Sequence, residues 1–207
     1  MGVLNSITNE FLVNFIANSI SLDTSLVTKE QVEKILDNQE SGLDEKLEKI
    51  VKNYLDAFLY AMTLASNKTE LTENILKDLH EKVVDGISVG GLYRNVDISI
   101  KGSNHTPCSY IKVYDRMAKY FITINDNNND TYYNVAFSHL QLLKVHPFLD
   151  GNGRLARIIL NFELVKNDLK PIYIDYNEKE KYFEMVEDFK VNKNINLFID
   201  FLKSTQN

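Results

Sequence analysis

The stretch from His146 to Arg157, His-Pro-Phe-Leu-Asp-Gly-Asn-Gly-Arg-Leu-Ala-Arg, concentrates groups that can act on phosphates. Gly151 and Gly153 can adopt positive φ angles that expose backbone N–H groups, and a helix starting close by adds the positive end of its dipole. Such a loop is a cradle for an anion. Arg154 and Arg157 lie three residues apart on the first turn of that helix, so both guanidinium groups can face one bound anion.

A histidine and a carboxylate flank this cradle. Pro147 disfavours helical backbone at His146, so we expect the preceding helix to end there and to present the imidazole at its tip. Asp150 would be poorly placed for a phosphate unless a magnesium ion lay between them. The residues therefore predict a nucleotide or polyphosphate site with His146 as a base at its edge. The alternative is that Gly-Asn-Gly is only a tight turn that starts a helix and that the arginines are surface residues.

Helices must position this stretch, because apolar residues recur at helical spacing along most of the chain. Val96 to Ile100 instead alternates apolar and polar residues before the turn-forming Gly102 to Pro107, which predicts one short β-hairpin. Thr28 is a plausible N-cap, with Gln31 completing a capping box. The expected fold is mostly α, a helical bundle with one β-hairpin. The expected helices cover residues 11–20, 28–36, 43–64, 72–84, 111–121, 132–145, 155–166 and, as one or two helices, 182–202.

Composition agrees with a mostly helical globular protein. The 207 residues include only 8 Gly and 3 Pro, too few for the turns of a many-stranded β fold. A formal charge of −6 argues against a nucleic-acid partner. The single cysteine, Cys108, excludes an internal disulfide, and no apolar run reaches the roughly 20 residues of a membrane span. We therefore expect a cytoplasmic protein with no membrane partner.

The segment 146–157 resembles the complete signature of the Fic family, His-Pro-Phe-x-Asp/Glu-Gly-Asn-Gly-Arg-x-x-Arg. The segment 91–107 resembles the β-hairpin flap of that family, and 182–202 resembles its closing helices. The resemblance implies a Fic-type bundle in which residues 1–207 form a single domain and 1–28 an N-terminal helix. It implies a protein adenylyltransferase, a nucleotidyltransferase that moves AMP from ATP to a Ser, Thr or Tyr hydroxyl of a target protein and to itself.

The resemblance also implies roles by position. His146 would be the general base, Asp150 would hold Mg²⁺ or Mn²⁺, Arg154 would hold the departing phosphates and Arg157 would reach the γ-phosphate. Tyr182 aligns with an aromatic pair of the adenine pocket, around which Phe183 and Lys190 depart from the commoner residues. The anion hole would comprise Gly151, Asn152 and Gly153. The target-docking flap would comprise Val96, Ile98, Ile100, Gly102, His105 and Thr106.

Many members of the family carry an inhibitory helix, Ser/Thr-x-x-x-Glu-Gly/Asn, whose Glu pairs with the second arginine of the signature. Here Ser19 fits that pattern, but Asp23 replaces the Glu and Thr24 the Gly or Asn. Because aspartate is one methylene shorter, we predict a stretched or water-bridged pair with Arg157, weak or absent autoinhibition and a lower tendency to remove AMP. Alternatively, Asp23 is merely a polar residue at a helix end.

Two other functions compete with adenylyl transfer. One is an ATP-sensing interaction module without chemistry, which the presence of both His146 and Asp150 disfavours. The other is a Fic variant that removes AMP or transfers a different phosphate group. We interpret His80 and His139 as structurally satisfied helix residues, whereas His105 could touch target or nucleotide. The resemblance leaves open whether the chain forms a homodimer.

Overall fold

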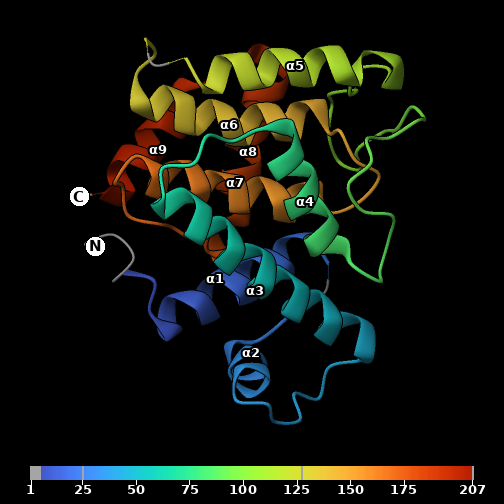
Figure 1. Ribbon diagram of the computed structural model, residues 1–207, viewed down its shortest axis with the longest axis vertical. Coiled ribbons are helices and arrows are strands. Elements are labelled where there is room, and N and C mark those ends of the chain that lie inside the picture. Colours follow the sequence, from blue (N-terminus) through green and yellow to red (C-terminus); the bar gives the residue numbers. More distant parts are fainter. Residues whose placement is uncertain (1–5, 25, 127, 207) are drawn as a thin grey trace.

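The computed structural model describes residues 6–24, 26–126 and 128–206, so the ends of the expected domain, 1–5 and 207, lie outside the described residues. Helices make up most of this part of the chain, as the apolar spacing predicted (Figure 1). Two short 3-10 turns, Tyr110–Lys112 and Tyr176–Glu178, precede α5 and α8. The α-helices are α1 (Asn9–Asp23), α2 (Lys29–Leu36), α3 (Glu45–Ser66), α4 (Glu73–Val84), α5 (Val113–Ile124), α6 (Thr131–Val145), α7 (Asn152–Lys166), α8 (Lys179–Asn192) and α9 (Asn196–Gln206).

Polar side chains define where several helices begin. The expected capping box is confirmed at α2, where Thr28 Oγ1 accepts from the Gln31 N–H and Gln31 Oε1 accepts from the Thr28 N–H. Thr72 and Asp130 accept in the same way from the first turns of α4 and α6. These bonds satisfy N–H groups that no helical carbonyl can reach, and each typically contributes about 1 kcal/mol.

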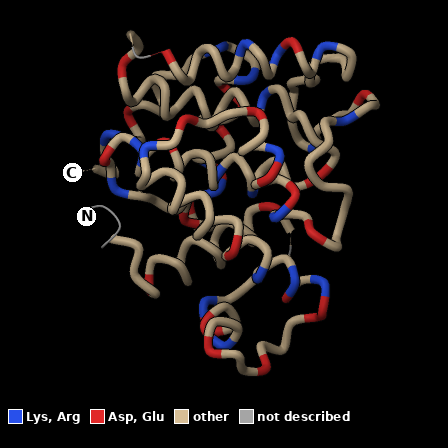
Figure 2. Tube along the Cα trace, viewed as in Figure 1, with Lys and Arg blue, Asp and Glu red and all other residues tan. Residues whose placement is uncertain are grey.

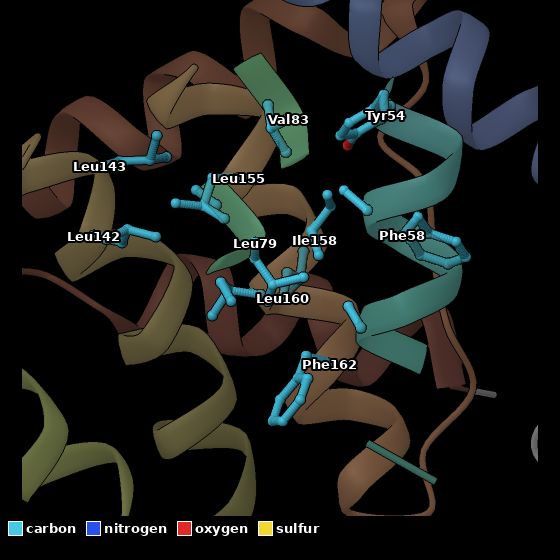
Figure 3. Packing of buried hydrophobic residues seen from close by; sticks show 14 of the residues in the cluster. Tyr54, Phe58, Leu79, Val83, Leu142, Leu143, Leu155, Ile158, Leu160 and Phe162 are labelled. Atoms are coloured by element: carbon cyan, nitrogen blue, oxygen red, sulfur yellow. The ribbon is translucent and has the colours of Figure 1, made fainter. Parts of the chain in front are cut away.

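Helix α7 is the centre of the bundle. It packs against α6, α3, α1 and α4, and its side chains are buried from Leu155 to Val165. Figure 3 shows its residues Leu155, Ile158 and Phe162 among side chains of α3, α4 and α6. A helix surrounded in this way has little freedom to shift, so its N-terminus is a rigid platform for the residues that precede it.

The expected β-hairpin over residues 96–107 is wrong, because the described residues contain no strand and this segment is a loop. Its turn is present, with Gly102 at φ +79° and the Ser103 N–H bonded to the Ile100 carbonyl. Val96 is 48% exposed and Ile98 and Ile100 are only half-buried, so the apolar face of the alternating pattern is not covered by the core. An isolated two-stranded ribbon is marginal in water, and side chains hold the loop instead. We keep the name flap for residues 95–107.

Charged residues are spread over many elements. Figure 2 shows acidic and basic positions interspersed along the trace. Within the described ranges, no helix is both long enough and apolar enough to cross a bilayer.

Candidate active site

His146 lies at the tip of α6, as Pro147 predicted. It caps that helix in the left-handed conformation, with φ 50° and ψ 62°, and its N–H still donates to the Leu142 carbonyl at 2.9 Å. The His146 carbonyl accepts from Arg94 Nε at 2.9 Å. The N–H and the carbonyl of His146 are therefore both hydrogen-bonded, which fixes the position of its Cα and the direction in which the side chain leaves the backbone.

The imidazole of His146 is half-buried and unprotonated at neutral pH. Burial lowers its pKa to about 4, and the positive charge of Lys190 adds to the lowering. Its Nδ1 has no hydrogen-bond partner in the part of the chain that the structure describes. Because Nδ1 is enclosed by protein, Nε2 is the ring nitrogen that an incoming hydroxyl can reach.

The loop between α6 and α7 brings backbone N–H groups to one point. Gly151 has φ +75°, and a Cβ there would lie 2.8 Å from Val84 Cγ1, so glycine is required. The first hydrogen bond of α7 joins the Leu155 N–H to the Gly151 carbonyl, which leaves the N–H groups of Asn152, Gly153 and Arg154 at the open end of the helix. Together with the helix dipole they form the expected anion cradle.

The side chain of Asn152 has a different role from its backbone. Its Oδ1 accepts from the Phe148 N–H at 3.0 Å, and its Nδ2 donates to the Phe148 carbonyl at 2.9 Å. The amide therefore closes the loop on itself, and only the Asn152 backbone N–H is available to an anion. The residue type alone did not indicate this division.

Arg154 and Arg157 are each only 2% exposed, so the alternative that they are surface residues is wrong. Arg154 Nη1 lies 3.5 Å from the Val83 carbonyl and Nη2 lies 3.5 Å from Asp150 Oδ1, while its Nε has no partner in the described ranges. These long contacts leave much of the guanidinium unsatisfied. A buried, weakly bonded arginine at a helix N-terminus is suited to bind phosphate oxygens.

Asp150 is the carboxylate that directly precedes the glycines of the cradle. Its Oδ1 accepts from the Gly151 N–H at 2.6 Å, and its side chain is 54% exposed. No group of three or more His, Cys, Asp or Glu side chains that could hold a metal occurs among the described residues. A metal here would therefore take most of its ligands from phosphate and water, which is the usual coordination of Mg²⁺.

His80 holds this loop from α4. Its Nδ1 accepts from the Gly91 N–H at 3.0 Å, so the proton lies on Nε2, which donates to the Asp150 carbonyl at 2.9 Å. Its ring stacks on Phe148 with centroids 3.6 Å apart, and burial lowers its pKa to about 4. The prediction that His80 is structurally satisfied is confirmed. Its link to the loop was not predicted, because 70 residues separate the partners in sequence.

The guanidinium of Arg157 is directed to α1. Its Nη2 donates to Asp23 Oδ2 at 2.6 Å and to the Ser19 carbonyl at 2.9 Å, and its Nε donates to Ser19 Oγ. Ser19 Oγ is in turn 2.7 Å from the Tyr54 hydroxyl. Burial disfavours the charged guanidinium, but Asp23 together with Tyr182 and Tyr54 offsets this, so that the pKa of Arg157 is raised.

The expected stretched or water-bridged contact between Asp23 and Arg157 is therefore wrong. The shorter side chain reaches the arginine because Gly153 leaves room for it. A Cβ at Gly153 would lie 2.6 Å from Asp23 Oδ1. The Asp23 carboxylate thus lies against the first turn of α7, beside the cradle, and it is not merely a polar group at a helix end.

Tyr182 lies in the core and not in an open pocket. It is 1% exposed, and its hydroxyl is 2.9 Å from His139 Nε2. His139 Nδ1 donates to the Ala156 carbonyl at 2.9 Å, so Nε2 accepts from the tyrosine. The structural interpretation of His139 is confirmed. In this arrangement the phenol joins α8 to α6.

The flap lies beside the base, and Arg94, which is 3% exposed, holds it there. Arg94 donates through Nη1 to the Val96 carbonyl at 3.0 Å and through Nη2 to the Cys108 carbonyl, while Nε holds the His146 carbonyl. His105 Nε2 is 3.1 Å from the Lys144 carbonyl. Ile98 and Ile100 are half-buried, whereas Val96, Gly102 and Thr106 are exposed. The sequence did not predict these hydrogen bonds of Arg94, which appeared only as one arginine in the segment that resembles the flap.

A neutral histidine beside a helix N-terminus with two buried arginines is an arrangement suited to bind a phosphate next to a base. Residues 70–164 match the model of the Fic/DOC family.

Similar proteins agree with this match. The chain is 25% identical over 196 residues to the protein adenylyltransferase Fic of Drosophila yakuba, an alignment that covers 90% of this chain and 39% of that protein. It thus spans about two fifths of the length of this relative. Among solved structures, Fic-1 of C. elegans superposes with a TM-score of 0.85 at 19% identity, covering 98% of this chain and 62% of that chain. A Fic-domain-containing signalling protein of Bacteroides thetaiotaomicron gives 0.82 at 22% identity, covering 98% and 84%. The structural likenesses show that the fold is shared.

Proposed function

We propose that this chain is a protein adenylyltransferase that transfers AMP from ATP to a hydroxyl side chain of a target protein and of itself. The observation that carries the proposal is the position of His146, an unprotonated base whose Nε2 is not enclosed, directly before the anion cradle at the start of α7. The name of the Drosophila relative supports the same activity.

ATP binding would use the cradle and the arginines. The backbone N–H groups at residues 152–154 would hold phosphate oxygens, and Arg154 would hold the phosphates that depart. Such a site neutralises charge at the leaving group, which is the main requirement of phosphoryl-type transfer. Within the described residues, most of the polar groups that could do this lie in the segment 150–157.

The chemical step would use His146 as general base. Its Nε2 would take the proton of the target hydroxyl, whose oxygen would attack the α-phosphorus. The new O–P bond forms as the bond to the β-phosphate oxygen breaks, so the products are an AMP-modified protein and pyrophosphate. In-line positioning contributes more than any covalent step of the protein.

Asp150 would hold Mg²⁺. Its carboxylate is 54% exposed, and Oδ1 is occupied by the Gly151 N–H, so Oδ2 can face a metal. The ion would neutralise charge on the α- and β-phosphates when bound. Mn²⁺ could replace it, since the ligands are oxygen atoms.

The flap would hold the target as an added strand. In the described part of the chain, the N–H groups from Val96 to Ile100 have no hydrogen-bond partner. An extended target segment could pair with them, and such backbone pairing places a hydroxyl without demanding a particular sequence. Arg94 joins the flap to the carbonyl of His146, so a docked segment would lie at the base.

Asp23 would act as a brake. It occupies Arg157 through a direct 2.6 Å contact, so a γ-phosphate must displace the carboxylate to reach this arginine. The contact favours regulation of the transferase over a loss of chemistry. It also makes the chain more similar to members of the family whose inhibitory carboxylate is a glutamate.

Intact-protein mass spectrometry after incubation with ATP and magnesium tests the activity. Wild-type and Asp23→Ala chains should gain AMP, and His146→Ala should gain none. The α,β-methylene analogue of ATP is the matched control, because its α–β bridge cannot be cleaved. If calorimetry shows ATP binding but neither wild type nor Asp23→Ala gains AMP, the chain is a binding module and the proposal is wrong.

A further inference from the structure

Tyr54 carries a buried hydroxyl that the proposed reaction does not use. It lies on α3 (Figure 3) and is fully buried, and its ring stacks on Phe15 of α1 with centroids 5.1 Å apart. Its hydroxyl oxygen is 2.7 Å from Ser19 Oγ, which also belongs to α1. Burial raises the pKa of the phenol, so the hydroxyl is neutral at any pH near neutrality. The ring and the hydroxyl of Tyr54 thus contact α1 one helical turn apart.

Ser19 supplies two acceptors to Arg157. Its carbonyl accepts from Nη2 at 2.9 Å and its Oγ accepts from Nε, and both nitrogen atoms lie on one edge of the planar guanidinium. Two bonds along one edge fix the direction in which the plane points. Because Asp23 also binds Nη2, these two bonds are the ones that remain when a phosphate displaces the carboxylate.

The contact with Tyr54 determines where the Ser19 hydroxyl lies. A serine side chain within a helix can rotate about χ1 and can donate to a carbonyl of the preceding turn. The phenol favours the one rotamer in which Oγ lies between Tyr54 and Nε of Arg157. Since α3 packs against α7 as well as α1, the position of Oγ is set by a helix that also supports Arg157.

We propose that Tyr54 is a positioning residue that, through the Ser19 hydroxyl, directs Arg157 toward the γ-phosphate and thereby makes the site prefer ATP over ADP. This inference rests on the proposed adenylyl transfer, in which Arg157 reaches the γ-phosphate once Asp23 is displaced. The phenol exchanges no proton and acts only through Ser19. Its effect is therefore confined to the one phosphate that distinguishes ATP from ADP.

A purely structural role of Tyr54 would give a different result. If the phenol only fastened α1 to α3, its loss would change the affinities for ATP and ADP alike, or neither of them. A selective loss of affinity for the triphosphate is expected only if the hydroxyl acts through Arg157. The effect should also require the Ser19 hydroxyl, which lies between the two side chains.

Calorimetry with the α,β-methylene analogues of ATP and ADP tests this without turnover. In the Asp23→Ala background, which removes the competing carboxylate, the triphosphate should bind more tightly than the diphosphate. Adding Tyr54→Phe should raise the Kd of the triphosphate by about 2- to 12-fold, the equivalent of one neutral hydrogen bond, and leave the Kd of the diphosphate unchanged. In a chain that also carries Ser19→Ala, Tyr54→Phe should have no further effect.

Tyr120→Phe is the matched control for folding. Tyr120 is likewise buried, at 1% exposure, and its hydroxyl donates to the Ser138 carbonyl of α6 at 3.0 Å. Like Tyr54→Phe, this variant should unfold at a lower urea concentration, because it also loses a buried hydrogen bond. Unlike Tyr54→Phe, it should leave the Kd values of both analogues unchanged.

Equal changes in the two Kd values on Tyr54→Phe, or no change in either, would overturn the inference and leave the phenol with a structural role. So would an undiminished effect of Tyr54→Phe in the Ser19→Ala chain, or equal affinity of the Asp23→Ala chain for the two analogues. These binding results do not depend on AMP transfer. Absence of AMP transfer by wild type and Asp23→Ala alike would instead refute the proposed function, while the nucleotide preference would still decide the role of Tyr54.

Discussion

Replacing Asp23 by alanine is expected to raise the rate of AMP transfer and to lower the stability of the folded chain. The carboxylate holds Arg157 Nη2 at 2.6 Å, so its removal frees a guanidinium group for the γ-phosphate. It also leaves a buried charge with only Ser19 as an acceptor on α1. Activity and stability should therefore change in opposite directions.

The magnitude follows from the burial of the pair. Arg157 is 2% exposed and the side chain of Asp23 is 22% exposed, so solvent screens the contact only in part. A hydrogen bond to a charged group contributes about 1.5–3 kcal/mol, which corresponds to roughly 10- to 150-fold in an equilibrium constant. ATP must overcome this contact in the wild type, so Asp23→Ala should raise kcat/KM by up to that factor. The free energy of unfolding should fall by about 1–3 kcal/mol, because both bonds to Ser19 remain.

The assay is the initial rate of AMP incorporation over a range of ATP concentrations, with urea unfolding measured on the same preparations. Asp23→Asn keeps a hydrogen-bond acceptor without the charge and should lie between wild type and Asp23→Ala. Asp56→Ala removes an exposed carboxylate from α3 and should change neither quantity. An Asp23→Ala chain with an unchanged or lower kcat/KM would refute the reasoning and would leave the pair with a structural role only.

Three further outcomes are expected. Because burial lowers the pKa of His146 to about 4, kcat/KM should stay level as pH falls from 8 to about 5 and drop only near the lowered pKa, and an acid limb near 6.5 would contradict this. Arg94→Met should lower the free energy of urea unfolding by about 3 kcal/mol or more, because several buried carbonyls lose their donor, whereas the exposed Arg116→Met should have little effect. Tyr182→Phe should cost about 1–3 kcal/mol in the same measurement, since His139 Nε2 loses its donor in the core, and an unchanged unfolding midpoint would contradict the assigned tautomer.

Local sequence patterns predicted most of the helices and the central segment of the site, residues 146–157. Pro147 limits the backbone before it, so the end of α6 at His146 was predictable, as was the capping box at Thr28. The glycines of the loop likewise indicated a cradle at the start of α7. Each of these features depends on residues within four positions of one another.

Features that depend on distant partners were not predictable from spacing. His80 and Gly153 acquire their roles only because α4 and α1 pack against the start of α7. The short side chain of Asp23 suggested that it would not reach Arg157. Because Gly153 has no side chain, α1 can lie close enough to α7 for the two residues to be in direct contact. The flap shows the reverse case, in which a local alternation at residues 96–100 predicted strands that have no neighbouring sheet to stabilise them.

The hydrogen bonds of Arg94 determine how freely the side chains of the flap can vary. Its shortest hydrogen bonds reach backbone carbonyls, including those of Val96 and His146, and its own N–H donates to the Pro147 carbonyl at 2.8 Å. Every residue type supplies a carbonyl, so side chains along the flap can be exchanged without loosening its attachment. The attachment of the flap is therefore independent of its side chains: residues 95–107 could carry a new set of side chains while the base keeps its place.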